Sequence, residues 1–297
     1  MNIDEYQALA AETMQFDKTQ EAALSIVMLG LNGEVGSLST EYKKKIRDGD
    51  SYALFREKLV EELGDIIWYL TSLATIEDIP VSEILNFNLK KTQERWADLQ
   101  GTAQLPLEGE YYDDQYDEQE QLPREFVTEF KESTDKKGKH CIEITVNGEP
   151  FGSTIRDNNY EDDYYRYHDL FHFAYVTCLG WSPTARGLMH KKRRSNEQVN
   201  EIEDGGRAIV IDEAISALVF EHARNHKFYE GVTTLDEQLL QTIRLLTRHL
   251  EVRKATPKEW EKAILTGFDV WRNLREEKSG RVICNLHEKT MYFEKLE

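Results

Sequence analysis

The stretch EELGDIIWYL, residues 61–70, decides the fold of the first part of this 297-residue chain. Its apolar side chains recur every three or four residues, which is the period of an amphipathic α-helix. Glu62 and Asp65 are three residues apart and therefore share one face of that helix. The same face borders side chains that must pack inward, namely Leu63, Ile66 and Leu70. The stretch therefore predicts a helix that carries two carboxylates beside a buried surface.

The helical period continues on both sides of this stretch. Gly49 is suited to end the second helix and Pro80 to begin the fourth. Helices joined by such short connections indicate a bundle. The predicted helices span residues 4–16, 20–47, 52–76 and 80–98.

Residues 101–122 differ in composition from both flanks. They contain seven acidic and no basic residues, mixed with tyrosine, and show neither a helical nor a strand period. We interpret this segment as a solvated acidic linker. It divides the chain into an N-terminal domain, residues 1–100, and a C-terminal domain, residues 123–297.

After the linker the period changes to that of strands. Residues 124–133 and 140–157 alternate, and NGEP is a turn signal, so we expect a β-hairpin. The predicted fold class is mainly α: an all-α helical bundle followed by a mostly helical α+β domain with a β-hairpin. The other expected elements of that domain are helices near residues 161–179, 206–226, 235–250 and 256–277, and short strands at RVICNL and TMYFEKL.

Composition excludes several classes of protein. The net charge of −18 disfavours binding to duplex DNA. A mean hydropathy of −0.62 and the absence of an apolar run near ~20 residues argue against a membrane protein, and the N-terminus lacks the order of a signal peptide. Three distant cysteines without a CxxC motif suit a reduced compartment. We therefore expect a cytoplasmic protein without membrane or duplex DNA partners.

A third carboxylate belongs with Glu62 and Asp65. Glu34 lies in the otherwise apolar stretch GLNGEVGSL. Carboxylates near a buried face are costly unless they are paired or bind a metal, and Mg²⁺ prefers oxygen ligands that it shares with phosphates. The alternative is a solvated charged stripe. That alternative does not account for the nearby glycines, because glycine inside a helix costs about 1 kcal/mol and needs a reason; these are Gly33, Gly36 and Gly64.

Several ordered motifs together resemble the MazG-like all-α NTP pyrophosphohydrolases. They are EYQALAAET, GLNGEVGSL, KKKIRDG, EELGDIIWYL and NLKKTQERW, within residues 1–98. The resemblance implies a homodimer or homotetramer that hydrolyses nucleoside triphosphates to the monophosphate and pyrophosphate. It also implies Mg²⁺, for which Mn²⁺ can substitute, held by four acids.

The resemblance assigns catalysis to Glu34, Glu62 and Asp65, which also bind the metal. The family often has a second glutamate three residues after the first, where this chain has Ser37. Glu41 lies two helical turns after Glu34, so it points along the same face and is the fourth expected metal ligand.

The resemblance also indicates substrate-binding residues. Asn88 and Lys91 match the family's last helix, and Arg95 lies one turn further on. Lys44 follows the metal-binding helix and is placed to meet the triphosphate, although ordinary charge at a helix C-terminus is the alternative. Trp68 is placed to stack on a base, but a core tryptophan is the commoner outcome.

The C-terminal domain offers a second set of candidates. In HDLFH, His168 and His172 are four residues apart and share a helix face, which is a metal-site spacing. Arg207 and Glu213 follow in EDGGRAIVIDEAISALVFEHA. Partly buried histidines that hydrogen-bond to carboxylates are the commoner alternative. The run MHKKRRS could bind phosphate or RNA, but is more often an exposed loop.

The C-terminal domain also has a resemblance of its own. PREF, LGWSP, EDGGRAIVIDE and GFDVWRNLR resemble the domain that follows a MazG-like module in some two-domain proteins, a domain without a firm biochemical role.

The resemblance of residues 1–98 predicts the function of the chain: a Mg²⁺-dependent nucleoside triphosphate pyrophosphohydrolase for nucleotide-pool house-cleaning or control. The alternative is a nucleotide-sensing or interaction protein with weakened catalysis, of a kind related to conflict with phage.

Overall fold

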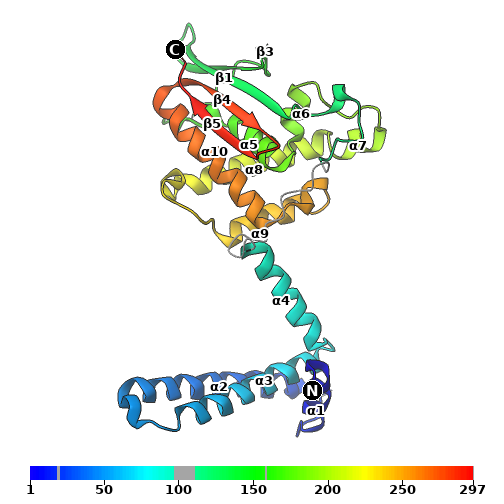
Figure 1. Cartoon of the computed structure of the whole chain (residues 1–297), viewed down its shortest axis with the longest axis vertical. Coiled ribbons are helices and arrows are strands. Elements are labelled where there is room, and N and C mark those ends of the chain that lie inside the picture. The colour runs from blue at the N-terminus through cyan, green and yellow to red at the C-terminus, as the bar shows by residue number, and fades with distance from the viewer. Residues whose placement is uncertain (19–20, 97–110, 158, 297) are drawn as a thin grey trace. The chain divides into compact units, whose positions relative to one another are not determined.

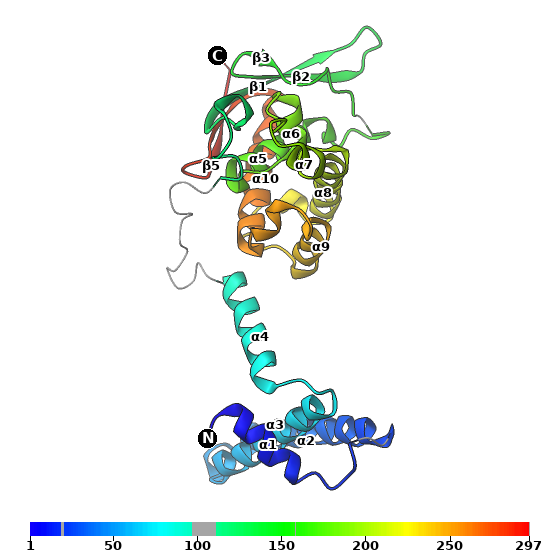
Figure 2. The same ribbon diagram turned by 90° about the vertical axis from the view of Figure 1, so that its right-hand side faces the viewer.

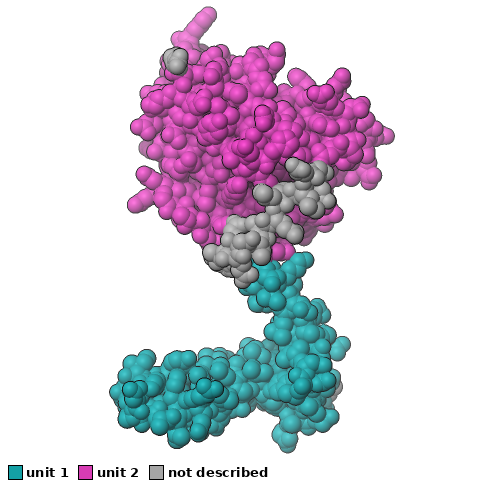
Figure 3. Space-filling view, viewed as in Figure 1, with its two compact units in different colours: residues 1–93 teal, residues 94–297 magenta. Residues whose placement is uncertain are grey.

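The structure, a computed structural model, describes residues 1–18, 21–96, 111–157 and 159–296. The chain is mainly helical with one small antiparallel sheet, as predicted. It divides into two compact units, residues 1–93 and 94–297, which Figure 3 distinguishes by colour. Each unit has its own set of internal contacts.

The four predicted helices are all present and visible in Figure 1; the first unit contains three of them and most of the fourth, whose last residues belong to the second unit. Helix α2 packs along α3, and α1 packs against α3. The crossing of α2 and α3 is close at Gly30, where a Cβ atom would overlap the ring of Tyr69. The helices are α1 (Ile3–Glu12), α2 (Glu21–Asp48), α3 (Phe55–Ile76) and α4 (Val81–Trp96), with a 3₁₀ turn η1 (Gly49–Ser51) between α2 and α3.

Many large apolar side chains of the first unit are exposed. Leu29 is 73% exposed and Phe87 is 72% exposed. Exposed apolar side chains in such number indicate a surface for interaction. Further exposed residues are Leu24, Ile26, Met28, Val35, Tyr42 and Ile46 on α2, Val60, Leu63, Ile67 and Leu70 on α3, and Ile84, Leu85 and Leu89 on α4. The expectation that Leu63 and Leu70 pack inward is therefore wrong for the single chain.

One helical segment of the first unit bears on the expectation that the chain is not a membrane protein. Residues Ala22–Ser51 are long and apolar enough, by length and composition alone, to cross a membrane. This is weak support for a membrane span, because core helices of other proteins pass the same test. The segment also carries Glu34 and the buried Glu41, and charges inside a membrane are costly.

The second unit is built on a five-stranded antiparallel sheet of order β3-β2-β1-β4-β5. The predicted hairpin and the two C-terminal strands are confirmed. The turn of the β1–β2 hairpin is at residues 135–139, whereas Asn147 and Gly148, both with positive φ, join β2 to β3. The strands are β1 (Glu125–Thr134), β2 (His140–Val146), β3 (Glu149–Pro150), β4 (Ser279–Asn285) and β5 (Thr290–Glu294).

Helices α5 and α10 pack together and against strands β4 and β5 (Figure 2). All residues of α5 from Asp169 to Cys178 are buried, so α5 is the central helix of the unit. The short helices α6 and α7 were not predicted. The helices are α5 (Asp169–Leu179), α6 (Pro183–Leu188), α7 (Glu197–Ile202), α8 (Gly206–Arg224), α9 (Glu237–Thr247) and α10 (Pro257–Glu277), and the 3₁₀ turns are η3 (Glu118–Glu120), η4 (Tyr165–Tyr167), η5 (Lys227–Tyr229) and η6 (Glu251–Lys254).

Residues 111–122, which composition assigned to the linker, are part of the second unit. Leu122 is buried in its core. Asp113 is also buried and accepts hydrogen bonds from Arg124 and Arg186, each at 2.7 Å. Burial opposes ionisation of Asp113, but these two guanidinium groups hold the pKa of the carboxyl below its ordinary value of 3.8. The rest of the predicted linker, residues 101–110, lies outside the described residues.

The basic run MHKKRRS is not simply an exposed loop. The guanidinium group of Arg193 is fully buried and pairs with Asp204 and Glu251, each at 2.7 Å. It also donates a hydrogen bond of 3.0 Å to the carbonyl oxygen of Tyr112. Arg193 therefore holds the α7–α8 connection, η6 and residues 111–122 together.

Gly205, directly before α8, is required by a close approach of the backbone. A Cβ atom at this position would overlap the carbonyl oxygen of Glu201 in α7. A Cβ atom at the neighbouring Gly206 would meet nothing within 4 Å. The tight connection between α7 and α8 therefore depends on the first glycine of the pair and not on the second.

The η5 turn has left-handed backbone conformations at three successive residues that are not glycine. Lys227, Phe228 and Tyr229 have φ values of 52°, 49° and 57°. Two aromatic contacts tie the turn to α10: the ring of Phe228 is tilted against Trp271 with centroids 4.7 Å apart, and Tyr229 meets Phe268 edge-on at 5.0 Å. Phe220 of α8 contacts Phe228 as well, so the turn depends on packing against both helices and not on its own backbone preference.

Candidate functional site

Carboxylates of α2 and α3 gather around Glu62. Its side chain is partly buried, and its pKa is raised, first by burial and then by the negative charges of Glu34, Glu41, Glu61 and Asp65. The predicted acids therefore lie close enough to repel one another. Such a group of carboxylates favours the binding of cations.

Glu41 has partners of its own. It is 5% exposed and accepts hydrogen bonds from Lys44, at 2.6 Å, and from the hydroxyl of Tyr52. The hydrogen bond from Lys44 and then that from Tyr52 lower the pKa of the Glu41 carboxyl. The same contact raises the pKa of Tyr52 to about 12. Two residues predicted for different roles, Glu41 for metal and Lys44 for phosphate, are thus paired with each other. Tyr52 was not predicted.

The glycines beside the acids face open space. A Cβ atom at Gly33, Gly36 or Gly64 would meet no atom within 4 Å. Close helix packing therefore does not explain these three glycines. They leave room beside Glu34 and Asp65 that a ligand can enter.

The acids of α2 and α3 do not form a closed metal site within a single chain. Among the described residues, a group of three ligand atoms within 4.8 Å of one another occurs only in the second unit. The predicted set of Glu34, Glu41, Glu62 and Asp65 is therefore gathered in one region but remains open.

The predicted substrate-binding residues lie in different environments. The indole of Trp68 donates a hydrogen bond of 2.7 Å to Thr13 and contacts the neighbouring tyrosine edge-on. Asn88 and Lys91 are exposed on α4. No described contact joins them to the acids.

Arg95 belongs to the second unit and is buried there. It donates hydrogen bonds to Glu261, at 3.0 Å, and to the carbonyl oxygen of Leu235, at 2.8 Å. A further ion pair joins it to Glu237 at 3.3 Å. These contacts give Arg95 a structural role in the second unit.

A histidine-carboxylate cluster lies at the start of α5. The ligand atoms of His168, Asp169 and His172 lie within 4.8 Å of one another, and all three side chains are buried. Nε2 of His168 lies 3.3 Å from Oδ1 of Asp169. Glu213 on α8 approaches both rings: Oε1 lies 3.4 Å from Nε2 of His172, and Oε2 lies 3.9 Å from Nε2 of His168.

The Nδ1 atom of each histidine is held by an acceptor. Nδ1 of His172 lies 2.9 Å from Asp212, which also accepts hydrogen bonds from Ser182, at 2.6 Å, and from the backbone of Thr184. Nδ1 of His168 lies 3.1 Å from the carbonyl oxygen of Tyr165. The role of Asp212 was not predicted. Its signal in the sequence is an acid in the middle of the apolar run AIVIDEAI.

Charge in the cluster is uneven. Burial opposes protonation of His172, but Asp212 and Glu213 raise the pKa of its imidazole well above the ordinary value of 6.5. Burial raises the pKa of Asp169, against the effect of the two histidines. Arg207 is exposed in the first turn of α8 and is not among the residues of this cluster.

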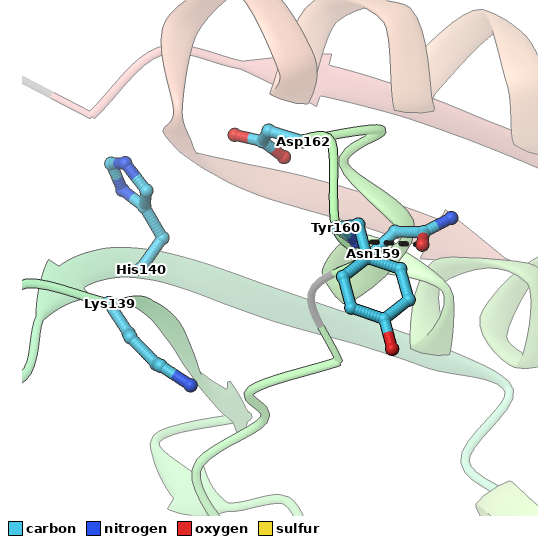
Figure 4. Close-up of a pocket in the computed structure, with 5 residues that line it drawn as sticks. All are labelled: Lys139, His140, Asn159, Tyr160 and Asp162. Atoms are coloured by element: carbon cyan, nitrogen blue, oxygen red, sulfur yellow. Dashed lines mark hydrogen bonds between the residues drawn. The ribbon is translucent and has the colours of Figure 1, made fainter.

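A shallow hollow on the second unit is lined by residues that belong to neither group of candidates. Figure 4 shows Lys139 and His140 on one side of it and Asn159, Tyr160 and Asp162 on the other. These residues include neither the acids of α2 and α3 nor the histidines of α5. The hollow therefore adds no support to either candidate site.

The chain is thus a mainly helical protein of two units: a helical unit with clustered acids, and a unit built from a small sheet and helices. This is the fold class that the sequence predicted. Residues 108–297 match the family model of the MazG C-terminal domain, and the chain belongs to this family. It is also 37% identical over 101 residues to the Gene 37 protein of Mycobacterium phage L5, an alignment that covers 32% of this chain and 89% of the phage protein. No solved structure matches the chain. The resemblance of residues 1–98 to the MazG-like pyrophosphohydrolases stays a prediction.

Proposed function

We propose that the first unit is a Mg²⁺-dependent nucleoside triphosphate pyrophosphohydrolase that acts on cytoplasmic nucleotides. The observation that carries the proposal is the group of carboxylates around Glu62. Because α2 packs along α3, the charges of Glu34, Glu41, Glu61 and Asp65 act on the Glu62 carboxyl and raise its pKa. Membership of the MazG C-terminal domain family supports it. Mn²⁺ is expected to replace Mg²⁺, because both prefer oxygen ligands.

The residues of the site fit the proposed ion and substrate. Glu34, Glu62 and Asp65 supply carboxylate oxygens, which are the ligands that Mg²⁺ prefers. Bound Mg²⁺ would polarise the phosphoryl oxygens and neutralise the leaving pyrophosphate. In the reaction, water adds to the α-phosphorus, the bond from that phosphorus to the bridging oxygen breaks, and one of the carboxylates accepts the proton of the water. The open space beside Gly33, Gly36 and Gly64 is where we expect the triphosphate to enter.

A second copy of the chain is part of this proposal. The exposed apolar side chains of α2, α3 and α4 would be covered in a homodimer or homotetramer, which would also shield the open acidic site. Leu29→Glu places a charge on this surface and should give monomers with reduced activity. Val210→Glu changes a similarly exposed residue of the second unit, 67% exposed, and should alter neither the assembly nor the activity. Analytical ultracentrifugation measures the assembly state of both variants. An active monomeric wild type would contradict the proposed assembly.

The catalytic test compares two glutamates of α3. Glu62→Gln keeps the shape of the side chain but removes the charge at the centre of the cluster. We expect it to lower pyrophosphate release from nucleoside triphosphates with Mg²⁺ by about 100-fold or more. Glu57→Gln changes an exposed glutamate near the start of the same helix and should leave the rate within about twofold. Equal rates in the two variants would reject the assigned site.

One observation favours the second function, a nucleotide sensor with weakened catalysis. Ser37 replaces a carboxylate of the family pattern, and Glu41, which could compensate, is already engaged by Lys44 and Tyr52. The same assay separates the two functions when it is paired with calorimetric titration of a nucleotide. Nucleotide binding without pyrophosphate release supports the sensor, and release supports the enzyme. Absence of both rejects the two functions together.

A further inference from the structure

We propose that His168, Asp169, His172 and Glu213 form a binding site for a transition-metal ion such as Zn²⁺, independent of the acidic site in the first unit. Two imidazole nitrogens and two carboxylates are a donor set suited to Zn²⁺, Mn²⁺ or Fe²⁺ and not to Mg²⁺ alone.

Two of the distances between the donor atoms match those around one ion. Ligand atoms about 2.0–2.2 Å from a tetrahedral ion are about 3.3–3.6 Å from one another. The distance from Nε2 of His168 to Asp169 is 3.3 Å, and that from Nε2 of His172 to Glu213 is 3.4 Å. The longer distance of 3.9 Å from Nε2 of His168 to Glu213 can close with a small rotation, because the Glu213 side chain is 41% exposed. Its exposure also leaves a path for the ion to enter.

The most specific observation is the state of the His172 ring. The side chain is completely buried, and its Nε2 atom makes no well-formed hydrogen bond, although Oε1 of Glu213 lies 3.4 Å away. A buried polar atom without a partner costs about 1–3 kcal/mol and requires an explanation. A metal ion bound between this atom and the carboxylate of Glu213 would use the lone pair of Nε2.

The hydrogen bonds behind the histidines are those of metal ligands. A metal-bound histidine usually donates its other N–H to a carboxylate or a backbone carbonyl, which fixes the ring and its tautomer. Nδ1 of His172 has the carboxylate of Asp212, and Nδ1 of His168 has the carbonyl of Tyr165. Asp212 is itself fixed by Ser182, so we assign it as a positioning residue.

The test uses the full-length chain after dialysis against a chelator. Zn²⁺ is titrated by calorimetry in the presence of excess Mg²⁺, which occupies the all-oxygen site of the first unit. We expect one tightly bound Zn²⁺ per chain. His172→Gln and Glu213→Gln should each weaken binding by about 100-fold or more. Glu213→Gln serves as the second variant because this half-exposed residue can change without disturbing the core.

Two further variants distinguish ligands from other residues. His226→Gln removes an exposed histidine of another i, i+4 pair, which stacks on His222, and should bind Zn²⁺ as the wild type does. Asp212→Asn should bind one ion with an affinity about 10–100-fold lower. With Co²⁺ as the probe, it should keep the strong visible absorption of a histidine-containing site. A merely structural role of Asp212 would change stability but not Co²⁺ affinity.

The Zn²⁺ titration of the wild type and of His172→Gln can overturn the proposal. If the wild type binds no Zn²⁺ beyond that bound by His172→Gln, the cluster is an ion pair between a protonated histidine and its carboxylates. If Zn²⁺ raises the unfolding temperature of the wild type but not of Glu213→Gln, the site is supported, because an ion that binds the folded state stabilises it.

Discussion

Replacing Arg193 with methionine tests how the second unit holds its α7–α8 connection. The guanidinium group is fully buried, and it satisfies Asp204, which is also fully buried, and Glu251. Methionine is unbranched and uncharged but shorter, so it removes the cation from both carboxylates, and the ion pair that Asp204 keeps is the longer one to Arg186 at 3.6 Å. Breaking a buried ion pair in this way costs about 3–5 kcal/mol. For a unit of this size, that corresponds to a decrease of roughly 10 °C in the unfolding temperature.

The measurement is urea unfolding followed by tryptophan fluorescence. Three fully buried tryptophans report on the second unit, namely Trp181, Trp260 and Trp271. The double variant Arg193→Met with Asp204→Asn should cost less than the sum of the two single variants, because the carboxylate that lacked a partner is gone.

An exposed ion pair is the control for this prediction. Arg281 pairs with Glu129 at 2.9 Å on the surface of the sheet, and its side chain is 44% exposed. Arg281→Met should cost less than about 1 kcal/mol. Equal losses in Arg281→Met and Arg193→Met would refute the argument that burial makes the Arg193 pairs indispensable.

Three further predictions concern stability and reactivity. Gly205→Ala should destabilise the second unit by about 1–3 kcal/mol in thermal unfolding, whereas Gly206→Ala should be neutral or stabilising by up to about 1 kcal/mol; similar effects would contradict the close approach. Asp113 has a lowered pKa in the folded state, so its contribution to stability is present above pH 3.8 and is lost as the pH falls through the folded pKa. The difference in the free energy of unfolding between wild type and Asp113→Asn should therefore be largest at neutral pH and become smaller below about pH 4. Burial raises the pKa of Cys178 to about 11 and that of Cys284 to about 12, so iodoacetamide at pH 8 should label neither until the protein unfolds, and rapid labelling in the native state would contradict their burial.

Helical periodicity predicted the long helices because each of them has a continuous amphipathic pattern. The short helices α6 and α7 escaped, since six residues are too few to establish a period. The boundary of the linker could not be read from composition. Asp113 is acidic and looks solvated in sequence, but its partner Arg186 lies 73 residues away, and only the fold brings the two together.

The candidate sites were also predicted only in part, because local spacing is visible in the sequence and contacts between distant residues are not. Spacing on a helix placed Glu62 with Asp65, and the packing of α2 along α3 adds Glu34. Sequence could not show that Glu41 is engaged by Tyr52, because that contact depends on the path of the chain through the turn after α2. Likewise, the spacing of His168 and His172 predicted a shared face, but the support of His172 by Asp212 comes from a different helix, 40 residues away.

The left-handed η5 turn has a consequence for the order in which the second unit assembles. The left-handed backbone conformation costs each of its residues about 1–2 kcal/mol, and the turn contains no glycine that would avoid this cost. Contacts with α10 and with α8 offset it, so the turn can form only once both helices are in place. We therefore expect its amide hydrogens to exchange with solvent earlier than those of the neighbouring helices, which would make this turn the point where the unit first opens.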